Sequence, residues 1–403
     1  MILGTCDSES DPMRDRFALD ASVTFLNHGS FGACPRSVLE RQSEVRALME
    51  AEPVRFFVEH APRAIDAARE RMAALVGAQP EDLVFVRNAT QAVNAVLASL
   101  PLAPGDELLT TDHAYAACKN ALEFFAERAG ARVVVASVPF PIARATQVEE
   151  AILGAVTPRT RLALIDHVTS PTGLVFPIEA IVSALRARGI ETLVDGAHGP
   201  GMLPLDLDRL GAAYYTGNLH KWLCAPKGCA ILHVRRDRQD GLRPLAISHG
   251  ARSRRPRPRL WEEFDFLGTD DPSPWICAPD ALDALESMLP GGLAALQQQN
   301  RELALFARHR LCETLRVAAP APDDMIASLA AVPLPPSDAP PAPSAFDGDP
   351  LATALYHRHR IEIPVFPWPA PPARVLRIAC QVYVERADVE RLCDALRQEL
   401  ADS

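Results

Sequence analysis

One lysine raises the first question about chemistry. Lys221 lies in the stretch TGNLHKWLCAPKG, between His220 and Trp222 and directly before an apolar run. Because an unpaired ammonium loses its hydration on burial, such a lysine either extends along the surface to solvent or performs chemistry. The chemistry open to it is Schiff-base formation with a carbonyl cofactor.

A second motif supplies a partner for this lysine. In ETLVDGAHGPG, Asp195 closes an apolar strand and His198 follows three residues later, while Lys221 stands 26 residues after Asp195, past the next apolar strand. Ligands of parallel sheets bind beyond the carboxyl ends of the strands, so both side chains are expected at one cleft. Pyridoxal phosphate needs this pair, because the lysine binds its aldehyde and the carboxylate keeps its ring nitrogen protonated. Taken alone, the aspartate could equally cap a turn.

The cofactor's phosphate also needs a binding site. VRNATQAVNAVL passes from a strand through Asn88, Ala89 and Thr90 into a helix, whose N-terminus offers free N–H groups to an anion. An ordinary N-cap would have the same pattern. A Walker loop and a clean G-x-G-x-x-G after a strand are both missing, which disfavours nucleotide-binding alternatives, a nicotinamide dehydrogenase included.

These residues need a framework of alternating strands and helices. Helical periodicity between the strands, as in IEAIVSALRARG, predicts right-handed crossovers and an α/β fold with a mainly parallel central sheet covered by helices on both faces. The apolar strands are predicted at 83–86, 106–111, 132–138, 161–168, 191–195, 212–217 and 229–234.

The flanking segments predict three parts. Residues 1–70 form an N-terminal arm and entry helices, 71–275 the large α/β domain, and 276–403 an interdomain helix and a smaller C-terminal α+β domain. The long helix is predicted at about 292–315, and a proline-rich connector at 333–350 cannot form a central strand. The basic, proline-broken loop at 250–274 is expected to be a solvated or interface loop.

Composition restricts the class of partner. With 41 lysines and arginines against 51 acids, the chain of 403 residues carries a formal charge of −10, which argues against nucleic acid and anionic membranes and favours a small-molecule substrate. The nine scattered cysteines lack paired metal spacing, so we expect free thiols in a cytoplasmic protein and no metal. We expect neither a membrane span nor a signal peptide.

Long stretches of the chain resemble the class V aminotransferase family, in particular its isopenicillin N epimerase-like members. The resemblance rests on TLVDGAHGPGMLPLDLDRLGAAYYTGNLHKWLCAPKGCAIL, on DHVTSPTGLVFPIEAI before it and on NHGSFGACPRSVLE near the start, and it extends from about Phe25 to Leu400. It implies the fold of PLP-dependent transferases (fold type I) and pyridoxal 5'-phosphate as the cofactor.

The resemblance implies cofactor-binding roles residue by residue. Lys221 matches the Schiff-base lysine, Asp195 the partner of the ring nitrogen, and His198 the position that hydrogen-bonds the phenolic oxygen. The other implied contacts are Ala89 and Thr90 in the phosphate turn, Asn218 and His220 just before the lysine, His113 or alternatively Tyr115 against the ring, and Ser170, where relatives often carry asparagine.

The resemblance also implies a dimer and a substrate site. Thr269 in FLGTDDP matches a segment that reaches across a homodimer interface to the neighbouring phosphate, and Arg377 matches the arginine for the substrate's α-carboxylate. A guanidinium can bind a carboxylate with two parallel hydrogen bonds. An arginine at a strand edge in a surface ion pair would give the same sequence pattern. Asn27 and His28 are expected at the substrate mouth, unless they form a plain turn.

The reaction stays open between several outcomes. With Lys221 as base at the α-carbon of an amino acid, reprotonation on the opposite face gives epimerisation, loss of a β-thiolate gives C–S cleavage, and reprotonation at the cofactor gives transamination. The C–S lyases that compete with the epimerase interpretation include ergothioneine-type sulfoxide lyases. Epimerisation needs a second acid, for which Tyr115, Tyr214, Tyr215 and His28 are candidates. A non-catalytic metabolite-binding protein with the same fold is the alternative from another class.

One branch is disfavoured by a missing residue. Cysteine desulfurases of the family need a nucleophilic cysteine before the substrate arginine, and no cysteine lies between Arg358 and Arg377. Cys380 follows that arginine inside the strand, where a buried structural thiol is expected. We therefore expect no persulfide on any cysteine during turnover with L-cysteine.

Overall fold

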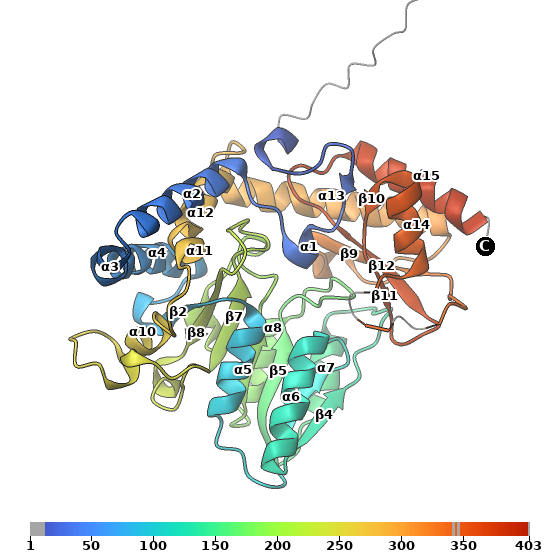
Figure 1. Cartoon of the computed structure of the whole chain (residues 1–403). Helices are drawn as coiled ribbons and strands as arrows, with labels where there is room; N and C mark the ends of the chain where they lie inside the picture. The colour runs from blue at the N-terminus through green and yellow to red at the C-terminus, as the bar shows by residue number, and fades with distance from the viewer. Residues whose placement is uncertain (1–12, 341–342, 345–346, 402–403) are drawn as a thin grey trace, which may run out of the picture.

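A seven-stranded sheet forms the centre of the molecule (Figure 1). The computed structural model describes residues 13–340, 343–344 and 347–401. The strand order is β2-β8-β7-β6-β5-β3-β4, in which β8 runs opposite to the other six strands, and those six share one direction. The strands are β2 (Leu83–Val86), β3 (Glu107–Thr111), β4 (Arg132–Ala136), β5 (Thr160–Asp166), β6 (Glu191–Asp195), β7 (Tyr214–Asn218) and β8 (Ala230–Val234). The predicted α/β fold with a mainly parallel sheet is confirmed.

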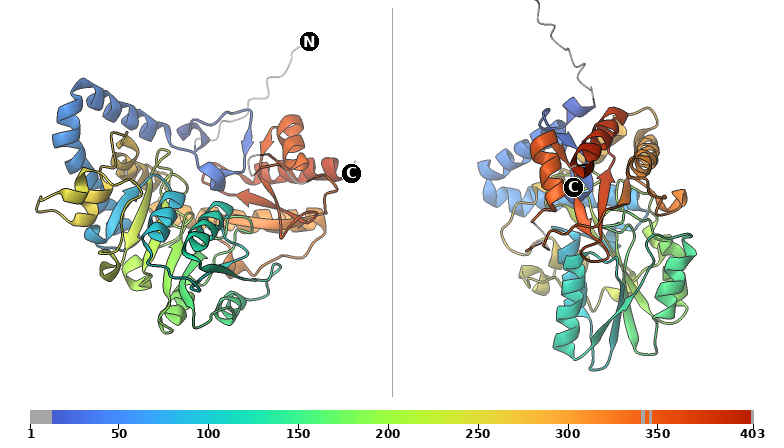
Figure 2. Two further views of the ribbon diagram at one scale, coloured as in Figure 1. Left: turned by 60° about the horizontal axis from the view of Figure 1, so that its bottom comes forward. Right: turned by 90° about the vertical axis from the view of Figure 1, so that its right-hand side faces the viewer.

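The two faces of the sheet belong to separate cores because successive side chains of a strand point in opposite directions. In β5, Leu162 and Leu164 pack in one core, whereas Ala163 and Ile165 pack in the other. Helices α5 (Ala89–Ser99) and α6 (Ala116–Ala129) cover the first face and lie in front of the sheet in Figure 1. Helices α4 (Ala61–Val76), α7 (Thr146–Gly154), α8 (Ile178–Arg186) and α9 (Leu207–Leu210) belong to the core of the second face, and Figure 2 shows helices on both sides.

The N-terminal and C-terminal parts lie at opposite sides of the molecule and are connected along α13 (Gly292–Leu315) (Figures 1 and 2). The N-terminal helices are α1 (His28–Phe31), α2 (Arg36–Ala51) and α3 (Pro53–Arg55), and α10 (Arg259–Phe264), α11 (Ser273–Ile276) and α12 (Ala278–Glu286) precede α13. The basic loop thus contains one short helix, α10, because Leu260 and Phe264 have an apolar core to pack against.

The C-terminal part combines a small antiparallel sheet with two helices. Its strands β9 (Leu329–Leu334), β11 (Val365–Pro367) and β12 (Arg374–Ala379) pair in the order β11-β12-β9, and its helices are α14 (Pro350–His359) and α15 (Arg386–Ala401). Pro333 lies on the edge strand β9, where its missing N–H breaks no ladder. The smaller α+β part is as expected, whereas the boundaries at 70 and 275 stay predictions.

One pairing joins the two ends of the chain. Strand β1 (Thr24–Phe25) runs parallel to β10 (Ile361–Glu362), and Asn27 bridges to Ala379 at the end of β12. The N-terminal turn is thereby held beside Arg377. Among the described residues no helix has both the length and the apolar composition that crossing a bilayer requires.

Candidate active site

The carboxyl ends of β5, β6 and β7 bring the residues predicted from separate motifs to one edge of the sheet. Asp166, Asp195 and Thr216 are register neighbours there, and Asn218 ends β7 three residues before Lys221. The Nζ atom of Lys221 lies 3.4 Å from Nε2 of His198. This is the juxtaposition expected of ligand sites in parallel sheets.

Lys221 is only partly exposed, and its surroundings favour the neutral amine. Burial lowers its pKa to about 8, and the Arg377 cation acts in the same direction while the Asp195 carboxylate opposes both. At pH 7 to 8 a useful fraction of the amine is therefore unprotonated and nucleophilic. Its backbone carbonyl is bonded to Nε2 of His28 over 2.9 Å, which anchors the lysine to the N-terminal turn.

Gly32 allows the N-terminal turn to approach the lysine this closely. A Cβ added at Gly32 would lie 2.3 Å from the carbonyl oxygen of His220 and 3.1 Å from Cα of Lys221. Its dihedral angles, φ 73° and ψ 166°, also belong to a region that only glycine adopts readily. Both the space and the backbone conformation therefore require glycine.

Asp195 is buried and held by two donors. Oδ1 accepts from the backbone N–H of Ala197 over 3.0 Å, and Oδ2 accepts from the Cys118 thiol over 3.1 Å. Burial, together with the Asp195 charge beside it, raises the pKa of Asp166 well above its usual range. Asp166 is thereby shifted toward its protonated form, with the Asp195 charge as one of the causes.

Trp222 determines which nitrogen of His198 carries the proton. Its indole Nε1–H can only donate, and it lies 3.0 Å from Nδ1 of His198. Burial lowers the pKa of His198, so the ring is neutral and its single proton is on Nε2, the atom that faces Lys221. His198 thus presents an N–H donor to the cleft, as hydrogen bonding to a phenolic oxygen requires.

The predicted phosphate turn is built from the start of α5 and the end of β7. The N–H of Ala89 donates to Oδ1 of Asn218 over 2.9 Å, and Asn88 caps the helix by accepting from the N–H of Gln91 over 2.8 Å. Thr90 lies in the first turn, and the ring of His220 is fixed by a 2.8 Å bond to the carbonyl of Cys229. The helix start remains a suitable place for an anion.

Arg377 is a buried cation without a carboxylate partner among the described residues. Only 1 % of it is exposed, and its donors reach the carbonyl oxygen of Ser170 at 2.5 Å, Oγ of Ser170 at 3.3 Å, Oγ of Ser30 at 3.2 Å and Oδ1 of Asn27 at 3.4 Å. Its Nε has no hydrogen-bond partner in the part of the chain that the structure describes. Burial lowers the pKa of Arg377 to about 10, which still leaves it charged at neutral pH. An uncompensated buried charge is costly, so this site suits an anion.

Two predicted ring contacts differ sharply in access. His113 is completely buried, with its nitrogens bonded to Oγ1 of Thr172 and the carbonyl of Val138, and its ring lies 4.3 Å from that of Trp368. Tyr115 is 45 % exposed. Of these two side chains, Tyr115 has the more accessible aromatic face.

Several other predicted residues lie next to the lysine but are already engaged. Ser170 contacts Arg377, as described above. His28 is buried, with Nδ1 bonded to the hydroxyl of Tyr383 over 2.7 Å and Nε2 to Lys221. Asn27 contacts Arg377 and Ser30, so of the N-terminal pair it is Asn27 that borders the predicted carboxylate site.

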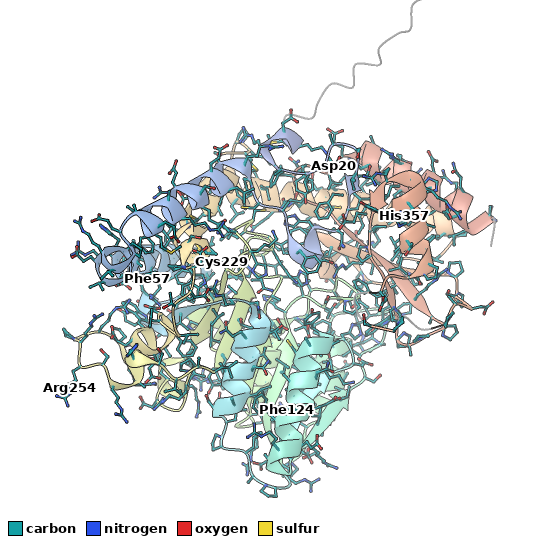
Figure 3. All side chains as sticks on the ribbon, in the orientation of Figure 1. Asp20, Phe57, Phe124, Cys229, Arg254 and His357 are labelled. Carbon is teal, nitrogen blue, oxygen red and sulfur yellow. The ribbon has the colours of Figure 1, made fainter. Side chains whose placement is uncertain are left out.

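Thr269 is exposed and lies in the basic loop. None of the hydrogen bonds around Lys221 and Arg377 described above involves it. It lines a cavity of about 650 Å³ that also borders Phe57 and Val58 on the N-terminal side and Arg87 and Gln91 beside the phosphate turn. Figure 3 shows Arg254 at the outer edge of the molecule. The loop is thus placed at the periphery.

Sequence reasoning missed four contributors to the site. Trp222 follows Lys221 directly, yet its role depends on its contact with His198. Cys118 and Ser30 come from other elements, and nothing in their sequence context indicates a contact with Asp195 or Arg377. Asp166 did carry a signal, because it closes an apolar strand just as Asp195 does.

The donor set fits pyridoxal phosphate. A partly neutral lysine amine, a buried carboxylate, an N–H donor on His198 and the start of α5 meet the needs of its aldehyde, ring nitrogen, phenolic oxygen and phosphate. Each of these groups arises from a different motif.

Comparison with known proteins places the chain in a family. The model of the class V aminotransferase family matches residues 29–392. The chain is 37% identical over 401 residues to isopenicillin N epimerase of Amycolatopsis lactamdurans, covering 96% of this chain and 97% of that protein, and 32% identical to a probable chloroplastic L-cysteine desulfhydrase of Arabidopsis thaliana, covering 95% and 84%. A lysine-to-alanine mutant of C-DES with glycine covalently linked to its PLP cofactor has the same fold, with a TM-score of 0.79 at 22% identity, covering 96% of this chain and 99% of that one. The expected fold, cofactor and enzyme class are confirmed, and the non-catalytic alternative is set aside. The chain belongs to the class V aminotransferase family and is a pyridoxal phosphate-dependent enzyme.

Proposed function

We propose that this enzyme epimerises the α-carbon of an amino acid, or of a small molecule that contains one. The observation that carries the proposal is the buried, uncompensated Arg377 cation close to the amine of Lys221, whose pKa it lowers. A charge held for a carboxylate and a base at short range suit a substrate whose α-carbon carries both a carboxylate and an acidic hydrogen.

The cofactor's contribution is an aldehyde that binds an amine covalently and a protonated ring that accepts negative charge from Cα. Lys221 would hold the aldehyde, and its amine would serve as the base for the substrate's α-proton. Asp195 keeps the ring nitrogen protonated, and His198 donates its Nε2–H to the phenolic oxygen. The start of α5, with Ala89, Thr90, Asn218 and His220, holds the phosphate.

Arg377 binds and orients the substrate's carboxylate. Ser170, Ser30 and Asn27 hold its guanidinium from the sides, so the planar fork is positioned before substrate arrives. We therefore assign Ser170 to the positioning of Arg377, and Asn27 to the rim of the substrate site. His28 acts from behind, by fixing the backbone of Lys221.

The second acid that epimerisation requires is Tyr115. Three other candidates are engaged or remote: Tyr215 is buried with its hydroxyl 3.0 Å from His167, His28 has both nitrogens bonded, and Tyr214 stands at the start of β7, away from Lys221. Tyr115 is exposed, and it is close enough to Arg377 and Asp195 for both charges to affect its pKa. In the proposed arrangement its aromatic face would pack on the cofactor ring, and its hydroxyl would supply the second acid.

A C–S lyase acting on a cysteine conjugate is the second candidate. It is favoured by the similarity to a probable L-cysteine desulfhydrase. The reaction also needs only one base, which Lys221 supplies, and a leaving group on the substrate. Persulfide chemistry is not proposed, because among the described cysteines all but Cys312 are buried.

Isotope exchange distinguishes the two reactions. The holoenzyme is incubated in D₂O with L- and D-amino acids and cysteine conjugates, and Cα deuteration, inversion, pyruvate and ammonia are followed together. Epimerisation gives deuterated, inverted product without pyruvate. Stoichiometric pyruvate and ammonia would instead show that the enzyme is a C–S lyase. Tyr115→Phe should retain exchange and lose inversion by at least about 100-fold, while Lys221→Ala should lose both.

We further propose a cytoplasmic homodimer. Large apolar side chains are exposed along the N-terminal helices and just before the basic loop, which is typical of a surface that a partner covers; they are Phe31, Val54, Val58, Leu245 and Ile247. In the dimer Thr269 reaches the phosphate of the neighbouring subunit. The eight described cysteines form no disulfide, which suits a reducing compartment.

A further inference from the structure

A buried histidine far from the lysine lacks hydrogen-bond partners. His233, on the antiparallel strand β8, is 3 % exposed, and neither ring nitrogen meets the criteria for a hydrogen bond to any residue that the structure describes. Buried imidazole nitrogens normally have a protein, water or metal partner. The nearest carboxylate oxygen, Oδ1 of Asp208, is 3.5 Å from Nε2, at the outer limit of hydrogen-bond distance.

Two carboxylates flank this imidazole, and each is held through one oxygen. Oδ1 of Asp82 accepts from Nε2 of Gln239 over 2.7 Å and from Arg236 over about 3 Å, and Oδ2 of Asp208 accepts from Nε2 of Gln79 over 3.2 Å. One ligand atom from each of Asp82, Asp208 and His233 lies within 4.8 Å of the other two. Carboxylates fixed through one oxygen leave the other free, an arrangement that is common around metal ions.

We propose that Asp82, Asp208 and His233 form a binding site for one divalent transition cation, with Zn²⁺ as its best fit. One imidazole and two carboxylates are a known type of zinc ligand set, and ligand bonds of about 2.0 to 2.1 Å place neighbouring donor atoms about 3.3 Å apart in a tetrahedron. The 3.5 Å between Nε2 and Oδ1 is close to that spacing. The guanidinium of Arg236 offsets part of the negative charge when the metal is absent.

The site is structural and separate from the active site. His233 pairs in register with Tyr215 near the start of β7, whereas Lys221 follows the end of that strand. Asp82 lies directly before β2 and Asp208 in α9, so the cation joins the edge of the sheet to α9. Paired-cysteine spacing could not predict it, because the three ligands are distant in sequence and none is a cysteine.

Zinc binding to the holoenzyme tests the proposal. Protein treated with a chelator and dialysed is titrated with Zn²⁺ in equilibrium dialysis with elemental analysis. We expect about one Zn²⁺ per chain with a micromolar or lower Kd, and a rise in Tm. Asp208→Asn, at an exposed position that should not disturb folding, and His233→Gln should each weaken binding by at least ten-fold.

Glu81→Gln is the matched control, since Glu81 neighbours Asp82 but contributes no ligand. It should leave the Kd for Zn²⁺ unchanged. The visible band of the bound cofactor should be the same in all three variants as in the parent protein. The proposal is wrong if Zn²⁺ does not bind below 100 µM, if Asp208→Asn binds as tightly as the parent, or if Glu81→Gln weakens binding equally. An ordered water at His233 would give the first of these results.

Discussion

A single indole N–H determines how His198 can act. Because Trp222 donates to Nδ1, the proton of His198 is on Nε2, the nitrogen that faces the cleft. Trp222→Phe keeps most of the packing volume but removes this donor, so the ring is free to adopt the other tautomer. We expect ¹⁵N spectra of the apoprotein to show loss of the Nε2–H form of His198, and kcat to fall about ten-fold.

Trp275→Phe is the control for this substitution. Its indole also donates to a single acceptor, the carbonyl of Gly228, and it is similarly buried, but it has no contact with His198. An unchanged His198 tautomer in Trp222→Phe, or an equal fall in kcat in Trp275→Phe, would contradict the assigned role.

The lowered pKa of Lys221 predicts how the apoenzyme takes up its cofactor. Only the unprotonated amine attacks the aldehyde, and burial brings its pKa to about 8. The rate of cofactor attachment should therefore rise as pH increases through about 8 and level off above 9, with a rate at pH 6 about 100-fold below the plateau. Stopped-flow growth of the visible band measures this rate, and a midpoint above 10 would show an ordinary lysine.

At the scale of elements, the packing of α1 against the lysine turn gives a stability prediction. Gly32→Ala places a Cβ against the carbonyl of His220 and forces a conformation that alanine avoids. We expect the free energy of unfolding to fall by about 2 kcal/mol or more, with weaker cofactor binding because His28 no longer fixes the backbone of Lys221. Denaturant titration and cofactor titration measure the two effects.

Gly105→Ala separates the clash from the backbone strain. Gly105 also has a positive φ, 86°, but a Cβ added there would meet nothing within 4 Å. It should cost less than Gly32→Ala and leave cofactor binding unchanged. Equal effects of the two substitutions would mean that the N-terminal turn does not support the site.

Elements formed by local interactions could be predicted from the sequence, whereas elements formed by long-range pairing could not. Strands with local apolar patterns, such as 83–86 and 191–195, were predicted at their observed positions, and their ends located Asp195 and Lys221. The pairing of β1 with β10 could not be predicted, because two-residue strands have no periodicity and their partners are over 330 residues apart. Likewise, the strand that contains Arg377 was expected to include Cys380 but ends at Ala379, and the side chain of Gln381 contacts Asn300 in α13 and His28 in α1.

Site contacts were harder to predict than site positions. Ser170 was placed in the right segment, but its contact is Arg377, because the course of the loop after β5 is set by its bridge from Leu174 to Ile326. His113 was expected against the ring, and its burial beside Trp368 depends on a C-terminal loop that no local pattern connects to it. Side-chain contacts of this kind are consequences of tertiary packing.

For the whole molecule, the proposed dimer predicts that each site uses residues of two subunits. Thr269→Ala removes a hydrogen bond to a charged phosphate, so the Kd of the cofactor should rise about ten-fold or more. Lys221→Ala removes the visible band altogether. Because these defects differ in kind, hybrid dimers of the two variants reveal which subunit supplies Thr269.

In a hybrid dimer, only the subunit that retains Lys221 forms the band. If Thr269 reaches the neighbouring phosphate, that site receives an intact Thr269 from the Lys221→Ala subunit, and its cofactor Kd equals the wild-type value. If Thr269 serves its own subunit, the same site shows the weakened Kd of Thr269→Ala. Co-expression with two affinity tags isolates the hybrid, and a cofactor titration of its band then decides between an active site built within one chain and one completed by its partner.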